Sequence, residues 1–312
     1  MHVLMPTHAL INDGAPFTRS EATFLGLTER GLRDAVRVGA IRRVLHSVYV
    51  DATVLDTRDL RLRCLHLVMP PHAVLCGTSA AWAMGIDAFQ PRDRFVLTPT
   101  CMVPHGSTRA TGKGVRTIEG IIPASDVMEL DGLRLTVPER TSVDLLRRLR
   151  RPFSLSAADA MAHAGLVAPE ALQERIDRLR GFPGIRQARQ LVRWIEPLTE
   201  SGGESWQRLR LLDAGFPRPY AQFWVCDRNG RKLYRLDLSY PHLLIACEYD
   251  GAEDHTADED RHADEARRGN MNERFGWRFV VCRKHDVLGS DPWFEIEVGK
   301  LLDREPVLPR LW

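Results

Sequence analysis

The architecture of the last third of the chain is indicated by the sequence Leu243-Leu244-Ile245-Ala246-Cys247-Glu248-Tyr249-Asp250-Gly251. This stretch begins with a near-continuous apolar run of strand length, which is typical of a central strand buried on both faces. The run then ends in charge. Side chains two positions apart on a strand share a face, so we expect Glu248 and Asp250 to point the same way from the end of this strand.

The sequence around this strand predicts a mixed sheet flanked by helices. Asp227-Arg228-Asn229-Gly230 predicts a hairpin turn, because Asn-Gly supplies the positive φ values that a tight turn needs. The predicted elements are, in chain order, a helix from Glu204 to a stop at Gly215, strands Tyr220 to Val225, Leu233 to Ser239 and Leu243 to Tyr249, a helix Ala257 to Arg274, a strand Arg278 to Arg283 and a helix Phe294 to Leu302.

Three carboxylates are expected to meet at the end of the apolar strand. Asp237 lies on the preceding strand and can face Glu248 and Asp250 across the ladder. Three converging carboxylates would repel one another and raise one another's pKa, and a cation removes that penalty. Ligands of oxygen alone suit magnesium or manganese rather than zinc. The sequence therefore predicts a Mg²⁺ (or Mn²⁺) site held by Asp237, Glu248 and Asp250.

Two further features fit chemistry on a phosphodiester. His255 follows the strand and has three candidate roles: a hydrogen bond to a metal-bound water, positioning of the scissile phosphate, or general acid catalysis. Arg267 and Arg268 lie on the predicted helix after it, and paired guanidinium groups are natural phosphate clamps.

The C-terminal motifs resemble a known family. Glu204, Arg235-Leu236-Asp237, Glu248-Tyr249-Asp250-Gly251, His255 and Gly276-Trp277 recur in the order of the Vsr-related, restriction-endonuclease-like domain of unknown function common in actinobacterial proteins. That group belongs to the PD-(D/E)XK nuclease superfamily. The resemblance covers about Glu204 to Leu302. It implies a mixed sheet flanked by helices and magnesium-dependent phosphodiester hydrolysis.

The same resemblance implies roles for single residues. Asp237 matches the metal-binding aspartate, Glu248 the acid of the (D/E)XK pair, and Glu204 the helix-borne acid found near the metal. Asp250 stands where the superfamily has lysine, so His255 becomes the substitute. Two alternatives stay open. The site as a whole could be a decayed nuclease that still binds nucleic acid. Glu204 could instead complement the dipole of its helix.

Phe17 to Ala52 predicts a winged helix-turn-helix. Thr18 and Thr28 are plausible N-caps of two short helices, Gly39 ends the second, and two short strands follow. The second helix would enter a DNA major groove while arginines of the wing contact phosphate. The alternatives are a solvated face or a protein–protein module. The candidate DNA-binding residues are Arg19, Arg30, Arg33, Arg37, Arg42 and Arg43.

The front of the chain resembles a second family. Thr18-Arg19-Ser20-Glu21-Ala22, Gly39 and Arg42-Arg43-Val44-Leu45 with Val48-Tyr49 look like the winged helix of AbiEi-type antitoxins. Ser79-Ala80-Ala81 and Pro138-Glu139-Arg140-Thr141 with Asp144 are similar to the domain that follows it. The resemblance implies repression of the protein's own operon and neutralisation of a cognate toxin protein. The middle region also predicts short strands Arg94 to Pro99, Val115 to Ile122 and Leu133 to Val137.

The length and composition of the chain limit the number of domains and the class of protein. A chain of 312 residues is long enough for two or three domains. We expect an α+β protein with a winged helix at 1–58, a mixed middle domain at 59–198 and a nuclease-like domain at 199–312, with a linker at Pro197 to Gly203. The six scattered cysteines, and the lack of a signal sequence or membrane span, predict a reduced cytoplasmic protein.

Two functions follow from these patterns. The first is a magnesium-dependent DNA endonuclease targeted by its winged helix, in phage defence or a toxin–antitoxin setting. The alternative is a non-catalytic, antitoxin-like transcriptional regulator that binds DNA and a cognate toxin. The three carboxylates favour the enzyme, whereas the missing lysine and the antitoxin-like front favour the regulator. The sequence leaves the oligomeric state open.

Overall fold

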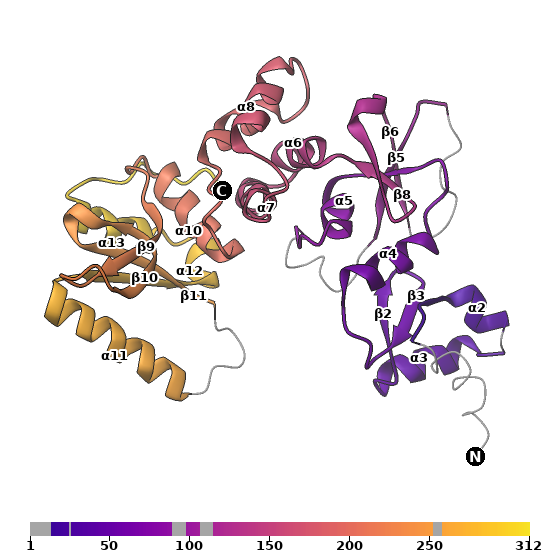
Figure 1. The fold of residues 1–312 in the computed structure, drawn as a ribbon, viewed down its shortest axis with the longest axis horizontal. Coiled ribbons are helices and arrows are strands. Elements are labelled where there is room, and N and C mark those ends of the chain that lie inside the picture. Colours follow the sequence, from indigo (N-terminus) through magenta and orange to yellow (C-terminus); the bar gives the residue numbers. More distant parts are fainter. Residues whose placement is uncertain (1–13, 25, 89–97, 107–114, 252–257) are drawn as a thin grey trace. The chain divides into compact units, whose positions relative to one another are not determined.

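The computed structural model describes residues 14–24, 26–88, 98–106, 115–251 and 258–312, and only the backbone of 258–264. Within these residues the fold is mixed α+β with three sheets (Figure 1), which confirms the predicted fold class. The chain divides into two compact units, Met1–Leu145 and Leu146–Trp312. Among the helices that the structure describes, none is long and apolar enough to cross a membrane.

The first sheet of unit 1 follows the predicted pattern closely. Helices α2 (Arg19–Phe24) and α3 (Glu29–Arg37) precede a hairpin of β2 (Ile41–Leu45) and β3 (Val48–Asp51), and β1 (Phe17–Thr18) completes an antiparallel sheet in the order β1-β3-β2. Both predicted caps are present. The Thr18 hydroxyl accepts the Glu21 N–H at 3.1 Å, and the Thr28 hydroxyl accepts the Gly31 N–H at 3.1 Å.

The rest of unit 1 contains a five-stranded mixed sheet together with helices. Its strand order is β6-β5-β4-β8-β7. The predicted strand Arg94 to Pro99 lies mostly outside the described residues, and the observed strand β5 begins at Thr100. The elements are α4 (Arg58–His66), β4 (Val74–Leu75), α5 (Gly77–Ala83), β5 (Thr100–Val103), β6 (Arg116–Glu119), β7 (Val127–Leu130), β8 (Leu133–Thr136) and α6 (Pro138–Arg148).

Unit 2 joins a helical layer to a four-stranded sheet. The helices are α7 (Arg151–His163), α8 (Pro169–Arg178), α9 (Ile185–Leu191) and α10 (Gly202–Asp213). The sheet has the order β12-β11-β10-β9, with β11 and β12 parallel and the other pairs antiparallel. Its elements are β9 (Tyr220–Cys226), β10 (Lys232–Tyr240), β11 (Ile245–Asp250), α11 (Asp258–Phe275), β12 (Arg278–Arg283), α12 (Lys284–Leu288) and α13 (Trp293–Leu302).

Each face of this sheet carries its own hydrophobic core. Leu238, Ile245 and Cys247 pack with residues of α10, α12 and α13. Leu236 and Ala246 pack on the other face with Met271 of α11. Figure 1 shows α11 on one side of the strands and α10, α12 and α13 on the other. The apolar strand is therefore central and covered on both faces, as its composition predicts.

The apolar run is not extended throughout, however. Pro241–Leu243 forms a short 3₁₀ turn, and Leu244 has a φ of 53°. Leu243 and Leu244 are 48% and 39% exposed, so only Ile245 to Cys247 are buried as expected. The tight connection between antiparallel β10 and β11 uses the first two leucines of the run, which is why the strand starts two residues late.

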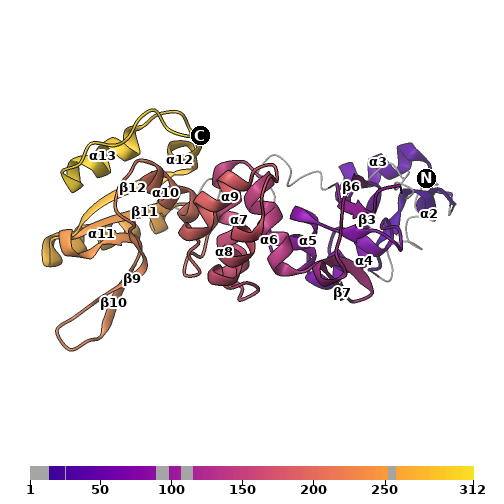
Figure 2. The same ribbon diagram turned by 90° about the horizontal axis from the view of Figure 1, so that it is seen from above.

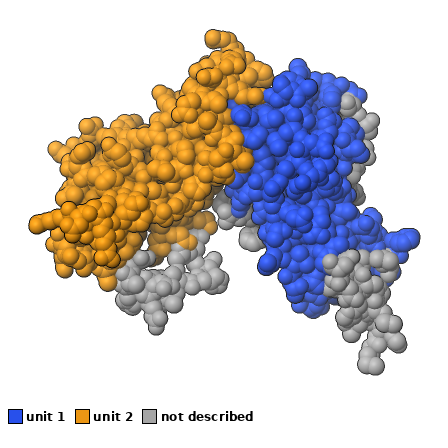
Figure 3. Space-filling model, in the orientation of Figure 1, with its two compact units in different colours: residues 1–145 blue, residues 146–312 orange. Residues whose placement is uncertain are grey.

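The unit boundary differs from the predicted domain boundary. The unit boundary lies between Leu145 and Leu146, inside α6 and within the region predicted as one middle domain. Figure 3 shows the two units in different colours. Helix α7 belongs to unit 2 because it packs on α10: the Trp206 Nε1–H donates to the Ser156 hydroxyl at 3.1 Å, and Arg208 pairs with Asp159 at 2.5 Å. Within the predicted linker Pro197 to Gly203, Thr199 and Gly203 are buried and the other residues are exposed.

Candidate functional site

Helix α10 brings Glu204 to the sheet. The Ser201 hydroxyl caps the helix by accepting the Glu204 N–H at 3.2 Å. The position before Glu204 must be glycine, since a Cβ on Gly203 would lie 2.0 Å from the Tyr249 ring. This close approach places Glu204 at the end of β11. Its side chain is 7% exposed, and its Oε2 accepts hydrogen bonds from Gln222 Nε2 at 2.8 Å and Glu200 N–H at 3.2 Å.

Asp237 lies where β10 and β11 stop pairing. The ladder runs from Tyr240↔Ile245 to Leu238↔Cys247. At the next position the Asp237 Oδ2 accepts the Tyr249 N–H at 3.0 Å. The side chain thus takes the place of a backbone partner, and this bond fixes the carboxylate beside the end of β11.

Glu204, Asp237 and Glu248 form a buried group that we call the carboxylate cluster. The pKa of Asp237 is raised to about 6, and burial is the largest cause. Glu204 and Glu248 also raise this pKa, whereas the Tyr249 N–H bond and Arg267 lower it. Glu248 is only 6% exposed. Repulsion between close carboxylates, which the sequence predicts, is therefore present at Asp237.

Asp250 does not join this cluster. Its Oδ2 accepts a bond from the Arg283 Nε–H at 3.0 Å, because parallel β12 places Arg283 in register with Asp250. Among the residues whose side chains the structure describes, no three His, Cys, Asp or Glu side chains come close enough to hold a metal ion. The predicted convergence of Asp237, Glu248 and Asp250 is thus not found there. A metal at this end of the sheet stays a prediction.

The two predicted phosphate clamps contact a carboxylate instead. Arg267 Nη2 lies 3.1 Å from Glu248 Oε2, and Arg268 Nη1 lies 3.4 Å from the same atom. Helix α11 crosses the face of the sheet from which Glu248 projects, so these arginines neutralise an acid that would otherwise be buried alone. His255, the predicted histidine, lies outside the described residues.

Gln222 is a neighbour of the cluster that the sequence does not single out. It has a φ of 51°, and its amide Nε2–H donates to Glu204. Its Oε1 atom is buried and has no hydrogen-bond partner in the part of the chain that the structure describes. A glutamine on a half-exposed strand carries no signal of this role, which depends on the local backbone irregularity.

The raised pKa of Asp237 predicts a pH-dependent stability effect. An acid whose folded pKa is raised destabilises the fold when ionised, so the penalty is absent below the usual value of 3.8 and complete above about 6. We expect Asp237→Asn to raise the free energy of unfolding by up to about 3 kcal/mol at pH ~8 and by under about 1 kcal/mol at pH ~4. Urea denaturation at both pH values measures this. Asp177→Asn on α8 is the exposed control, and an equal gain at both pH values would contradict the argument.

The candidate DNA-binding arginines of unit 1 differ in their partners. Arg19 pairs with Glu29 at 2.5 Å, and Asp34 pairs with Arg37 at 3.0 Å and with Arg30 at 4.0 Å. The Arg42 Nη2–H donates to the Val54 carbonyl at 2.9 Å.

Arg33 and Arg43 are the exceptions. They are exposed and make no ion pair or hydrogen bond with any residue that the structure describes. Both line an open groove of about 460 Å³ between α3 and the hairpin, together with Arg19 and Tyr49. The sequence gives the six arginines equal weight, whereas the structure leaves these two available for a ligand.

The match to a family model covers the second sheet of unit 1 and the helices that follow it. The fold is a two-unit α+β chain with a basic helix-and-hairpin segment at its front. Residues 73–194 match the family model described as AbiEi antitoxin C-terminal domain. The match begins after the helix-and-hairpin segment and ends before α10.

Two relatives are similar over most of the chain. They are Uncharacterized protein MT2308 of Mycobacterium tuberculosis strain CDC 1551 / Oshkosh and Uncharacterized protein Rv2248 of strain H37Rv. Each is 28% identical over 284 residues, which cover 89% of this chain and 98% of the relative. Neither unit alone has that many residues, so the similarity extends over both.

One solved structure is similar in part. It is the crystal structure of RV2827C protein from Mycobacterium tuberculosis, at 18% identity and a TM-score of 0.33, covering 61% of this chain and 76% of that one. A likeness this distant carries no argument about function.

Proposed function

We propose that the chain is an antitoxin-like, DNA-binding transcriptional regulator in a toxin–antitoxin or abortive-infection system. The observation that carries the proposal is the match of residues 73–194 to the AbiEi antitoxin C-terminal domain. The segment before it has the element order of a winged helix-turn-helix, two helices and a hairpin. In such a module the second helix enters the major groove. A cognate toxin is the second partner that the family description supports.

The unpaired arginines support DNA as the partner of this segment. Arg33 lies on α3, the helix that would enter the groove, and Arg43 lies on β2 of the hairpin. Neither has an acidic partner among the described residues, so each can contact DNA without first breaking an ion pair. Arg19, Arg30 and Arg37 each have one, and we infer that they contribute less.

The test of this function uses the DNA upstream of the protein's own gene. We expect the purified chain to bind that fragment more tightly than a shuffled fragment of equal length, and to repress a reporter fused to it. Coexpression should relieve the toxicity of the partner toxin if one is encoded beside it. Equal binding to both fragments together with an unrepressed reporter would contradict the proposal.

A metal-dependent nuclease in unit 2 is the second candidate. The carboxylate cluster lies at one end of the sheet, in a helix–hairpin–strand–helix–strand order that resembles the Vsr-like, PD-(D/E)XK domain. The cluster and the unpaired Gln222 Oε1 offer oxygen ligands only, which fits Mg²⁺ or Mn²⁺. As they lie, these described side chains are not close enough together to hold an ion. Asp237, Glu248 and Glu204 would have to move together to hold it, with Asp250 at its edge. The ion would supply an activated water and stabilise charge on the phosphate.

The chain's own residues set a condition for this candidate. Glu248 is paired with Arg267 and Arg268, so metal binding requires these arginines to move away from it. Once released they would contact the phosphate, which is the role that the sequence predicts for them. His255 is the candidate general acid in the same proposal.

Cleavage of supercoiled plasmid tests the nuclease candidate. We expect nicking with Mg²⁺ or Mn²⁺, none with EDTA, and loss of nicking in both Asp237→Ala and Glu248→Ala. Magnesium should also raise the melting temperature of the wild type but not that of Asp237→Asn. No cleavage and no thermal shift would eliminate this candidate and leave the regulator. Cleavage that survives both substitutions would place the site elsewhere.

A further inference from the structure

The β9–β10 hairpin extends beyond the helices of unit 2. Figure 2 shows its far end projecting away from the body of the unit. The turn is fixed by Asp227, whose Oδ1 accepts the Asn229 N–H at 2.8 Å and the Arg231 N–H at 2.9 Å. Gly230 has the positive φ of 78° that the turn requires. The end of the hairpin is therefore an ordered structure.

One face of the hairpin is covered and the other is open. Phe223, Val225, Tyr234 and Leu236 pack in the core beneath α11. Alternation places Trp224 on the opposite face, where it is in register with Arg235. Trp224 is 39% exposed.

Cations surround this tryptophan. Lys232 Nζ lies 4.9 Å from the centroid of the Trp224 ring, and the Arg235 guanidinium lies 5.8 Å from it. Arg235 is also held by Glu200 through two bonds of 2.8 Å. The ring and the glutamate thus order two cations on the open face, which reduces the entropy lost when a ligand binds.

The end of the hairpin is strongly basic. Arg228, Arg231 and Lys232 are exposed and make no ion pair with any residue in the described part of the chain. From Asp227 to Arg235 there are four basic residues and one acid, so the net charge of this short segment is 4 − 1 = +3. The Asp227 carboxylate is already occupied by backbone N–H groups.

We propose that the open face of this hairpin is a second DNA-binding surface, which contacts the phosphodiester backbone through Arg228, Arg231 and Lys232. The occupant rests on the DNA partner proposed above, whereas the surface is new and lies in the other unit. Positively charged side chains without acidic partners, held on an ordered hairpin, are complementary to phosphate groups. Contacts between such side chains and phosphate position DNA without reading its sequence.

Protection of an exposed sheet edge does not explain these charges. Charged residues that protect an edge belong on the edge strand itself. The edge strand is β9, whose sequence Tyr-Ala-Gln-Phe-Trp-Val-Cys carries no charge. The cations are instead in the turn and on β10, which is the inner strand. Gln222 lies two residues before Trp224, and its amide donates to Glu204 of the carboxylate cluster.

The test measures the salt dependence of binding to a random-sequence duplex. The full chain is compared with Arg228→Ala/Arg231→Ala/Lys232→Ala and with a control, Arg178→Ala/Arg186→Ala/Lys300→Ala, which loses the same charge from exposed helices of unit 2. For the hairpin variant we expect the slope of log K against log salt to flatten by about 2 to 3, between about 50 and 200 mM salt. We also expect affinity at the lower salt to fall by about 10-fold or more.

The possible outcomes separate this inference from the proposed function. An unchanged slope in the hairpin variant, or an equal change in the control, would overturn the second surface. If that variant binds normally while substitutions in α3 and β2 abolish binding, only this inference fails. A wild type that binds no DNA would overturn both proposals. The melting temperature of the variant should equal that of the wild type, since the three side chains make no hydrogen bonds in the described structure.

Discussion

Replacement of the two unpaired arginines by Arg33→Glu/Arg43→Glu should abolish specific DNA binding by the full chain. We expect affinity for the upstream fragment to fall by about 100- to 1000-fold, because loss of a single arginine contact to DNA costs about 1–3 kcal/mol and the new carboxylates repel phosphate. Both side chains line the groove between α3 and the hairpin, so they would act on the same stretch of DNA. The reporter should be fully derepressed.

The control keeps the change in charge but moves it. Arg178→Glu/Arg186→Glu alters exposed helices of unit 2 by the same four charge units, and it should leave affinity within about 3-fold of the wild type. Arg30→Ala/Arg37→Ala should have a smaller effect than Arg33→Ala/Arg43→Ala, because Asp34 already pairs with both of its arginines. Equal losses of affinity in these two alanine variants would mean that the ion pairs with Asp34 do not weaken the DNA contacts of Arg30 and Arg37. Unchanged affinity in Arg33→Glu/Arg43→Glu would show that α3 and β2 are not part of the DNA interface.

Local signals account for the parts of the fold that the sequence predicts well. The threonine caps of α2 and α3, the Asn-Gly turn and the apolar strand all specify structure through neighbours in the sequence. Their bounds agree with the structure to within two residues. The main exception is Leu243 and Leu244, where the short connection between two antiparallel strands overrides an apolar run.

Long-range contacts account for the parts that the sequence does not predict. Nothing near Glu248 in the sequence indicates that Arg267 will pair with it, since the two meet only when α11 crosses the sheet. Asp250 is likewise drawn to Arg283 by the parallel pairing of β11 with β12. Periodicity identifies which residues share a face, but ion pairs between faces and helices depend on how the elements pack. The predicted carboxylate set therefore differs from the observed cluster by one member.

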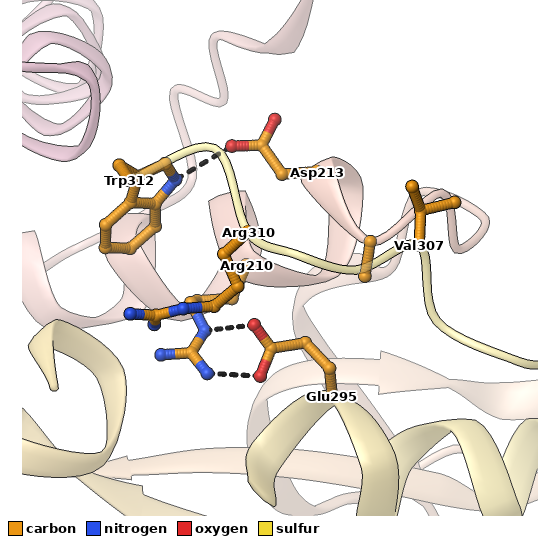
Figure 4. Close-up of a pocket in the computed structure, with 7 residues that line it drawn as sticks. Arg210, Asp213, Glu295, Val307, Arg310 and Trp312 are labelled. Atoms are coloured by element: carbon orange, nitrogen blue, oxygen red, sulfur yellow. Dashed lines mark hydrogen bonds and ion pairs between the residues drawn. The ribbon is translucent and has the colours of Figure 1, made fainter. Parts of the chain in front are cut away.

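Removal of the buried guanidinium of Arg210 should strongly destabilise unit 2. Arg210 is 1% exposed and pairs with Glu295, which is equally buried, through both of its carboxylate oxygens (Figure 4). Its remaining N–H groups donate to the carbonyls of Asp286 at 2.9 Å, Val287 at 2.8 Å and Asp291 at 2.9 Å. One side chain thus joins α10 to α12, to α13 and to the connection between them.

We expect Arg210→Met to lower the free energy of unfolding of unit 2 by about 3–5 kcal/mol, because it leaves the Glu295 carboxylate buried without a partner. This is a large share of the ~5–15 kcal/mol that stabilises an ordinary domain. Arg235→Met is the matched control, since Arg235 makes the same two-bond pair with Glu200 at the surface, and its loss should cost under about 1 kcal/mol. Urea denaturation followed by tryptophan fluorescence measures both.

A double substitution separates the buried charge from the lost bonds. Arg210→Met/Glu295→Leu leaves no buried charge, so it should be more stable than Arg210→Met alone even though it removes a second polar side chain. It should not regain wild-type stability, because the three carbonyls that Arg210 serves still lack donors. If the double variant is the least stable of the set, the pair contributes mainly through packing. If Arg210→Met costs no more than Arg235→Met, burial of the pair has no energetic consequence, and the buried ion pair does not stabilise unit 2 more than the exposed one does.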